Sequence, residues 1–182
     1  MNQMTDTPLA VSKQRITIKP DPRELRGLYD ALKAMDKAAN DSLKDEVTGI
    51  SKWTQQGIVY ASYSAPMPKQ AAIVAGSIRA NRDRIPYLTI GGTKGKAKNG
   101  TSSGVLLFGS EFGASPTSKA GAFPNGGRRF PYRSAKQGKG SAGYWIFPAL
   151  KAMQPEITDR WKAAVDRVLN HWEDGPGGGL NG

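Results

Sequence analysis

The pattern that most constrains the fold is a row of apolar residues at three- and four-residue spacing between residues 25 and 50. Side chains at this spacing lie on one face of an α-helix, so the row predicts a long amphipathic helix. The row comprises Leu25, Leu28, Tyr29, Leu32, Met35, Ala39, Leu43, Val47 and Ile50. Asp21 stands at the N-cap position, Pro22 follows at the first helical position, and Glu24 lies in the first turn. A helix this long needs a sheet or a neighbouring subunit to pack against.

A second amphipathic pattern occupies the C-terminal part of the chain. Its apolar face comprises Ile157, Trp161, Ala164, Val165, Val168, Leu169 and Trp172. Pro148 is expected to begin a helix and Pro155 to begin it again, because proline is tolerated in a first turn but not in a helix interior. The glycine-rich run after Asp174 ends the pattern. We expect the two tryptophans to lie in a core or an interface.

Shorter patterns between these two helices predict strands and one more helix. Arg15–Lys19 alternates and is expected to be an edge strand, and the proline inside Ile85–Ile90 favours an edge position for that strand too. Val105–Phe108, between two glycines, reads as a strand in the core of the sheet, and Gly143–Phe147 as a buried strand. Lys69–Ala80 fits a short helix with a face of small residues.

These elements predict an α+β fold. We expect a small, mostly antiparallel sheet packed by the long N-terminal helix and the C-terminal amphipathic helix, with long basic loops between them. The chain of 182 residues is long enough for one domain with a real core. We assign residues 1–14 to a flexible N-terminal arm, 15–174 to the single domain and 175–182 to a flexible Gly-rich tail.

Charge is concentrated in the middle third of the chain. The net charge is +11, and the segment from Arg79 to Lys139 holds twelve Lys and Arg residues but only two acids. Such a patch attracts a polyanion, of which DNA is the commonest, although a solvated basic loop that confers solubility explains it equally well. The candidate DNA-facing residues are Lys94, Lys96, Lys98, Arg128, Arg129 and Arg133.

Two basic stretches are expected to be loops. The stretch 93–103 has three lysines, two glycines and no apolar residue larger than alanine, and we expect it to be flexible. The stretch 115–143 carries Phe123, Phe130 and Tyr132 among basic residues. Those aromatics suit either a stacking platform for single-stranded nucleic acid or anchors that pin a long loop onto its own domain or a neighbour, and we favour anchors.

The chain lacks the residues that several classes of function require. The chain has no cysteine and a single histidine, His171, which leaves no thiolate site and almost no imidazole for catalysis. The run from Gly91 to Lys96 lacks the spacing of a phosphate-binding loop. Apart from Asp83, Glu111 is the only acid in the basic middle, and no pair of acids has a catalytic spacing. We expect no enzymatic activity, no cofactor and no metal, and a soluble protein made in the cytoplasm, without a membrane partner.

Three short motifs between the two amphipathic helices carry a resemblance to a known family. They are Phe108-Gly-Ser-Glu-Phe-Gly113, Phe130-Pro-Tyr132 and Phe147-Pro-Ala149. In this order they resemble the head–tail joining proteins of long-tailed bacteriophages, and more narrowly the tail-completion or neck proteins of phages and gene transfer particles. The chain departs from the family at Ala75-Gly-Ser-Ile78, which replaces a Thr-Gly-x-Leu step, and in its longer basic insert Thr93–Thr101.

The resemblance implies a structural protein of the virion neck, assembled in the host cytoplasm. Its subunits would form a ring, commonly six-fold, between the head connector and the tail tube, with genomic DNA passing through the lumen without sequence-specific contact. Other neck proteins, the tail terminator or the tail tube would be its partners. A tail terminator or head-closure (stopper) ring, and a free sequence-independent DNA-binding protein, are the alternatives.

Nine residues are expected to have structural or intersubunit roles in such an assembly. Glu111 is expected to partner one of the surrounding basic residues, with Gly109 and Gly113 turning the backbone away from the sheet. The full set is Phe108, Glu111, Phe112, Phe130, Tyr132, Trp145, Phe147, Trp161 and Trp172.

Overall fold

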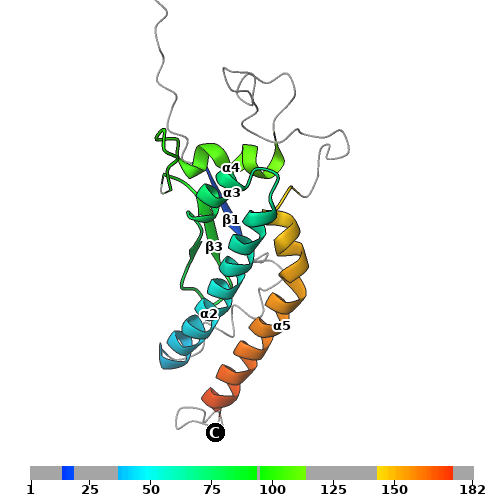
Figure 1. The fold of residues 1–182 in the computed structure, drawn as a ribbon. Helices are drawn as coiled ribbons and strands as arrows, with labels where there is room; N and C mark the ends of the chain where they lie inside the picture. Colours follow the sequence, from blue (N-terminus) through cyan, green and yellow to red (C-terminus); the bar gives the residue numbers. More distant parts are fainter. Residues whose placement is uncertain (1–13, 19–36, 94, 114–142, 174–182) are drawn as a thin grey trace, which may run out of the picture.

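The computed structural model describes residues 14–18, 37–93, 95–113 and 143–173 (Figure 1). In chain order the elements are β1 Arg15–Ile18, α2 Lys37–Ala61, the 3-10 helix η1 Ser62–Ser64, α3 Pro68–Ala75, β2 Arg79–Ala80, β3 Leu88–Gly91, α4 Ser103–Phe112 and α5 Ile146–Glu173. The predicted α+β class is confirmed, with a long helix on the N-terminal side, another at the C-terminal end and a small antiparallel sheet. The predicted helix start at Asp21, the tail, and the arm up to residue 13 lie outside the described residues.

The two long helices, α2 and α5, form an antiparallel pair that extends away from α4 (Figure 1). Their contacts show the direction, because Glu46 meets Arg167 whereas Gly57, later in α2, faces Met153, earlier in α5. The core between them, here called the helix-pair core, comprises Leu43, Val47, Ile50, Ile85, Trp161, Ala164, Val165 and Val168. Helix α2 continues beyond Ile50 to Ala61, so neither Gly49 nor Gly57 ends it. None of the described helices is both long and apolar enough to cross a membrane.

The sheet has three strands in the order β1-β3-β2, and both pairings are antiparallel. Arg15 pairs with Gly91 and Ile18 with Leu88, which confirms the predicted edge strand at β1. The predicted edge position of the second strand was wrong, since β3 is central. Strand β3 begins after Pro86, so the N–H group that proline lacks is not needed for a hydrogen bond of the sheet.

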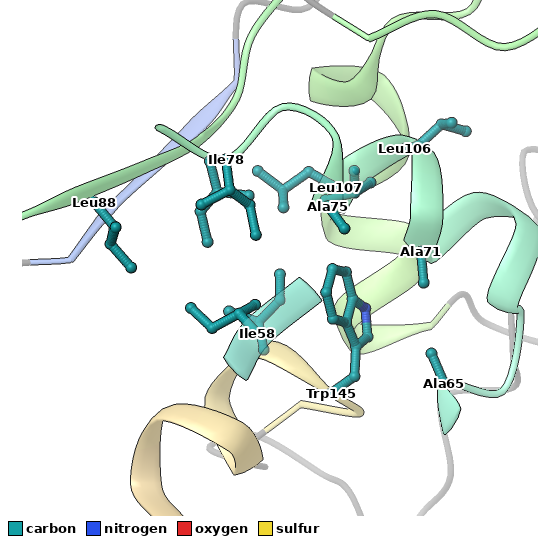
Figure 2. Close-up of a cluster of buried hydrophobic side chains, with 12 residues drawn as sticks. Ile58, Ala65, Ala71, Ala75, Ile78, Leu88, Leu106, Leu107 and Trp145 are labelled. Carbon is teal, nitrogen blue, oxygen red and sulfur yellow. The ribbon is translucent and has the colours of Figure 1, made fainter. Parts of the chain in front are cut away.

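A second core, here called the sheet core, lies between the sheet, α3, α4 and the near ends of the long helices (Figure 2). Its buried members are Ile58, Ala65, Ala71, Val74, Ala75, Ile78, Leu88, Ile90, Leu106, Leu107, Trp145 and Ile146. Helix α3 is shorter than predicted. It ends at Ala75, and the chain then turns into β2 through a hydrogen bond from the Ile78 N–H to the Ala75 carbonyl.

Two predicted strands are helical. Val105–Phe108 belongs to α4, which buries Leu106, Leu107, Ser110 and Glu111, a helical spacing of three and four residues. An apolar run this short fits a strand or a helix equally well. Packing on two sides of α4 favours the helix.

The predicted strand Gly143–Phe147 is a turn followed by the start of α5. The predicted restart at Pro155 was also wrong, because α5 runs through it. Pro155 lies on the exposed side of α5, so its ring does not enter the core.

Candidate functional sites: a buried carboxylate and a basic surface

The Glu111 carboxylate lies buried at the N-terminus of α5, although it belongs to α4. Its side chain is 0% exposed. One carboxylate oxygen, Oε2, accepts hydrogen bonds from the backbone N–H groups of Trp145 at 3.2 Å and Ile146 at 2.9 Å, and Oε1 accepts one from Phe147 at 3.0 Å. The first N–H groups of a helix have no partner within the helix. Glu111 therefore caps α5 from a different helix and joins α4 to α5.

The turn before α5 is shaped to receive this carboxylate. The Tyr144 N–H donates to the Glu111 carbonyl at 2.8 Å, and the Trp145 Nε1–H donates to Ser110 Oγ at 3.2 Å. Gly143 has φ of 79°, a conformation that favours glycine, and a Cβ there would run into the Glu111 side chain. Any other residue at this position would push the two helices apart or displace the carboxylate.

Two effects act in opposite directions on the pKa of Glu111. Burial raises the pKa of the Glu111 carboxyl above its ordinary value of 4.5, and the three backbone donors act in the other direction without cancelling the effect. We expected a basic side chain as the partner of Glu111. Backbone N–H groups take that place, and no ion pair of Glu111 occurs within the described residues.

The other predicted structural residues divide into two groups. Phe108, Phe112 and Phe147 form a row beside the capped turn, with ring centroids 6.1 Å and 5.7 Å apart. Trp145 is buried in the sheet core, and Trp161 is buried in the helix-pair core, where its Nε1–H donates to the Arg84 carbonyl at 2.9 Å. Phe130, Tyr132 and the side chain of Trp172 lie outside the described residues.

The β3–α4 loop, defined as residues 95–102, forms several backbone hydrogen bonds. The Ala97 N–H donates to the Thr101 carbonyl and the Gly100 N–H to the Ala97 carbonyl, each at 2.9 Å. At the α4 end, the Ser103 N–H donates to the Gly95 carbonyl at 2.8 Å. The loop is therefore held in place by backbone hydrogen bonds at its tip and at its base.

These hydrogen bonds also exclude a phosphate site at the start of α4. The Gly104 N–H donates to the Gly92 carbonyl at 2.8 Å, and the Val105 and Leu106 N–H groups both donate to the Ser102 carbonyl. A helix N-terminus binds an anion through unpaired N–H groups, and these are already used. The glycine-rich run before α4 is a structural turn.

A basic surface surrounds the β3–α4 loop. Lys96 and Lys98 lie exposed on the loop. The exposed Arg15 lies beside Gly92 at its base, where an added Cβ would be 2.9 Å from Arg15 Nε. The sequence did not single out Arg15 or Lys69 of α3, because both are distant from the loop along the chain. Lys94, Arg128, Arg129 and Arg133 lie outside the described residues.

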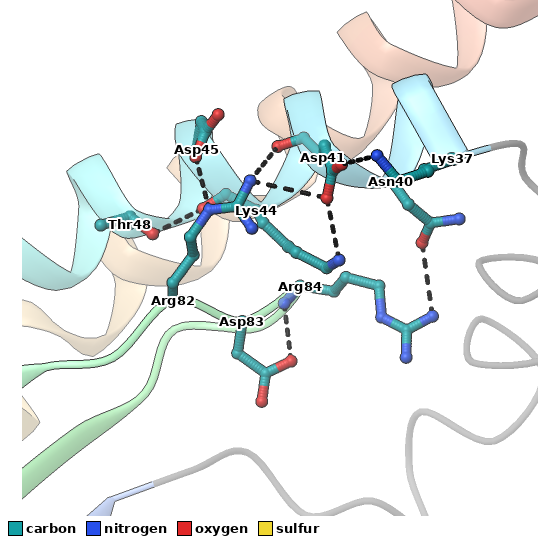
Figure 3. A network of polar contacts seen from close by, with 9 residues as sticks. All are labelled: Lys37, Asn40, Asp41, Lys44, Asp45, Thr48, Arg82, Asp83 and Arg84. Carbon is teal, nitrogen blue, oxygen red and sulfur yellow. Dashed lines mark hydrogen bonds and ion pairs between the residues drawn. The ribbon is translucent and has the colours of Figure 1, made fainter.

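The charges on α2 and residues 82–84 are arranged differently, because several acids and bases there pair with each other (Figure 3). Arg82 Nε lies 2.7 Å from Asp45, and Asp41 lies 3.1 Å from Lys44. The hydrogen bond and charge of Lys44 lower the pKa of Asp41, and the hydrogen bond of Arg82 lowers that of Asp45. Such exposed pairs add little stability, but they neutralise this surface.

No metal-binding arrangement is found in the described part of the chain. It holds no group of three or more His, Asp or Glu side chains placed to bind a metal. An open groove between α2 and α5 is flanked by Arg160 and Arg167, whose guanidinium groups are paired with Glu156 and Glu46. This groove therefore offers no unneutralised charge to a ligand.

Comparisons of the chain with protein-family models, with curated proteins and with solved structures found no match. The likeness to phage neck proteins thus rests on the motifs alone. Two of them meet in space, because Glu111 of the first motif binds Phe147 of the third. The Glu-Phe-Gly step ends α4, and Pro148 and Ala149 lie in the first turn of α5.

Proposed function

We propose that the protein is a structural component of the neck of a long-tailed phage or a gene transfer particle, a tail-completion or head–tail joining protein. Its subunits form a ring, six-fold by the family resemblance, between the head connector and the tail tube. Genomic DNA passes through the lumen, and the protein catalyses no reaction. The proposal combines the motif resemblance with one observation, the separation of charge between the two parts of the molecule.

One part, here called the sheet block, consists of β1, η1, α3, β2, β3, the β3–α4 loop and α4 with the short turns between them. The described residues of the sheet block include five Lys and Arg and a single acid, Glu111, which is buried. The helix pair with residues 82–87 holds nine Lys and Arg against eight acids. A subunit that is basic on one part and nearly neutral on the other suits a protein that meets DNA through its basic part.

Exposed apolar side chains support assembly with other proteins. Tyr60 is 78% and Tyr63 68% exposed, and their rings meet edge to face at 6.0 Å. On α4, Val105 and Phe108 point outward from a helix whose inner face is also apolar. Aromatic side chains in this position are frequent anchors of protein interfaces.

The test is whether the protein is part of the particle. Mass spectrometry of purified particles should detect it at a few copies per particle, and deletion of its gene should leave DNA-filled heads and separate tails that join when the protein is supplied. Infectious particles that assemble without it would refute the proposal. A monomer absent from particles that binds short duplexes tightly at physiological salt would instead support the free DNA-binding alternative.

A matched pair of variants tests the assembly surface. Tyr60→Ser with Tyr63→Ser should lower incorporation at least tenfold, because each interface aromatic commonly contributes about 1–3 kcal/mol. Lys52→Gln with Lys162→Gln, two exposed changes on the helix pair, should leave incorporation within about twofold. Equal incorporation of both double variants would show that the tyrosine pair is not an interface.

A further inference from the structure

We infer that one surface of the sheet block, made by Arg15, Lys69, Lys96 and Lys98, binds the phosphate backbone of duplex DNA, and that the helix pair faces away from the DNA. This inference rests on the proposed function and deepens it. It names the residues and the orientation of the subunit.

The four cations come from three elements that the fold brings together around the β3–α4 loop. Arg15 of β1 pairs with Gly91 at the end of β3, shortly before the β3–α4 loop. A Cβ on Gly95 would lie 3.0 Å from the carbonyl of Ile73, so the loop packs against α3. Lys69 precedes Ile73 by one helical turn and is exposed. The elements that carry the four cations therefore lie beside the same loop.

No acid within the described residues neutralises this surface. None of the four cations takes part in an ion pair with a described acid, whereas Arg82, Arg160 and Arg167 of the other part all do. The single acid of the sheet block, Glu111, is buried and bonded to backbone N–H groups. The positive potential of the surface is thus available to a polyanion.

The chemistry fits phosphates and not bases. Lysine is a flexible point charge that binds phosphate oxygens without the planar, bidentate geometry that reads a guanine edge. The loop that carries two of the lysines is fixed by its own hydrogen bonds, so less entropy is lost when it binds. Phosphate contacts position a protein on DNA without sequence preference, as a channel through which a whole genome passes requires.

The size of the effect follows from counterion release. Each phosphate contact with duplex DNA contributes about 0.9 to the negative slope of log K against log salt concentration. Four contacts correspond to a slope of about 3 to 4, or roughly a 100-fold loss of affinity between 50 and 200 mM salt. The slope therefore counts the contacts independently of the absolute affinity.

The experiment measures binding of the full-length protein to a fluorescent mixed-sequence DNA duplex at several NaCl concentrations. The quadruple variant Arg15→Gln, Lys69→Gln, Lys96→Gln and Lys98→Gln should bind more weakly, and its salt slope should be lower than that of the wild type by about 3. A change of duplex sequence should alter the affinity of the wild type by less than about threefold. Thermal unfolding followed by circular dichroism verifies that the variant is folded.

The control removes the same charge from the helix pair. Lys37→Gln, Lys52→Gln, Lys151→Gln and Lys162→Gln change exposed residues of α2 and α5 and should leave the slope within about 1 of the wild-type value. A slope that falls equally in both variants, or falls only in the control, overturns the inference. Loss of the slope in the first variant only, in a protein absent from particles, would support this surface while refuting the neck function.

Discussion

Removal of the Glu111 carboxylate should destabilise the monomer strongly. In Glu111→Ala, the N–H groups of Trp145, Ile146 and Phe147 lose their acceptors, and the first two residues are buried. Each buried donor left without a partner costs about 1–3 kcal/mol, while relief of the desolvated carboxylate recovers part of that sum, so we expect a net loss of about 3–5 kcal/mol. This is a large part of the 5–15 kcal/mol that is typical for a whole domain.

Glu111→Gln should be intermediate. An amide oxygen at the Oε2 position still accepts from Trp145 and Ile146, but the amide nitrogen then faces the Phe147 N–H. One lost hydrogen bond of this kind costs about 1–3 kcal/mol. An intersubunit role of Glu111, as considered from the sequence, predicts instead that this substitution weakens assembly more than folding. The buried position of Glu111 now predicts that folding is affected first.

Urea unfolding followed by tryptophan fluorescence measures these differences. The matched control is Glu156→Gln on the exposed face of α5, which removes only an ion pair with Arg160 and should cost less than about 1 kcal/mol. Hydrogen exchange provides the local readout, because the amides of residues 145 to 147 should lose protection in Glu111→Ala. A Glu111→Ala protein within about 1 kcal/mol of the wild type would refute the capping role.

Three further predictions concern pH and glycine positions. Because the pKa of Glu111 is raised in the folded protein, protonation of this carboxyl adds stability that is complete below the ordinary pKa of 4.5 and is lost as the pH rises through the raised value. The stability of the wild type relative to Glu111→Gln should therefore fall from pH 4 upward in urea titrations, and a rise would contradict the assignment. Gly143→Ala should destabilise the protein by more than the roughly 1–2 kcal/mol expected for Gly100→Ala. Both glycines have positive φ, but only an added Cβ at Gly143 meets the Glu111 carboxylate. Equal melting temperatures of the two variants would argue against a close fit of Gly143 to Glu111. Gly49 has open space around it on α2, so Gly49→Ala should stabilise the protein by about 0.5–1 kcal/mol. Gly57→Ala should stabilise it less, because the Met153 side chain must move. A larger stabilisation by Gly57→Ala in thermal melts would show that α2 and α5 pack loosely at this point.

Elements with a long repeating pattern were predictable. The apolar rows of α2 and α5 extend over several turns, so their helical period is distinct from the alternation of a strand. The short edge strand β1 was also predicted, from strict alternation alone. By contrast, α4 presents only a brief apolar run between glycines, and a run of that length fits either period. Its burial on the sheet core determined the outcome.

The candidate sites were harder to predict from the sequence than the helices were, because they depend on the tertiary fold. The sequence singled out Glu111 as an unusual acid, but its partners lie more than thirty residues further along the chain, and they are backbone groups whose positions no residue type reveals. The sequence also predicted that Lys96 and Lys98 belong to a basic surface. It missed Arg15 and Lys69, which join that surface only because β1 pairs with β3 and the loop packs on α3.

The sequence by itself determined the two long helices, the α+β class and the excess of positive charge, because periodicity and composition are properties of neighbouring residues. The tertiary structure decided which charges are neutralised, which remain open to a polyanion and which acid caps α5. Capping, burial and ion pairing act through space between residues distant in the chain. The partition into a nearly neutral helix pair and a basic sheet block therefore emerges only when the chain is folded.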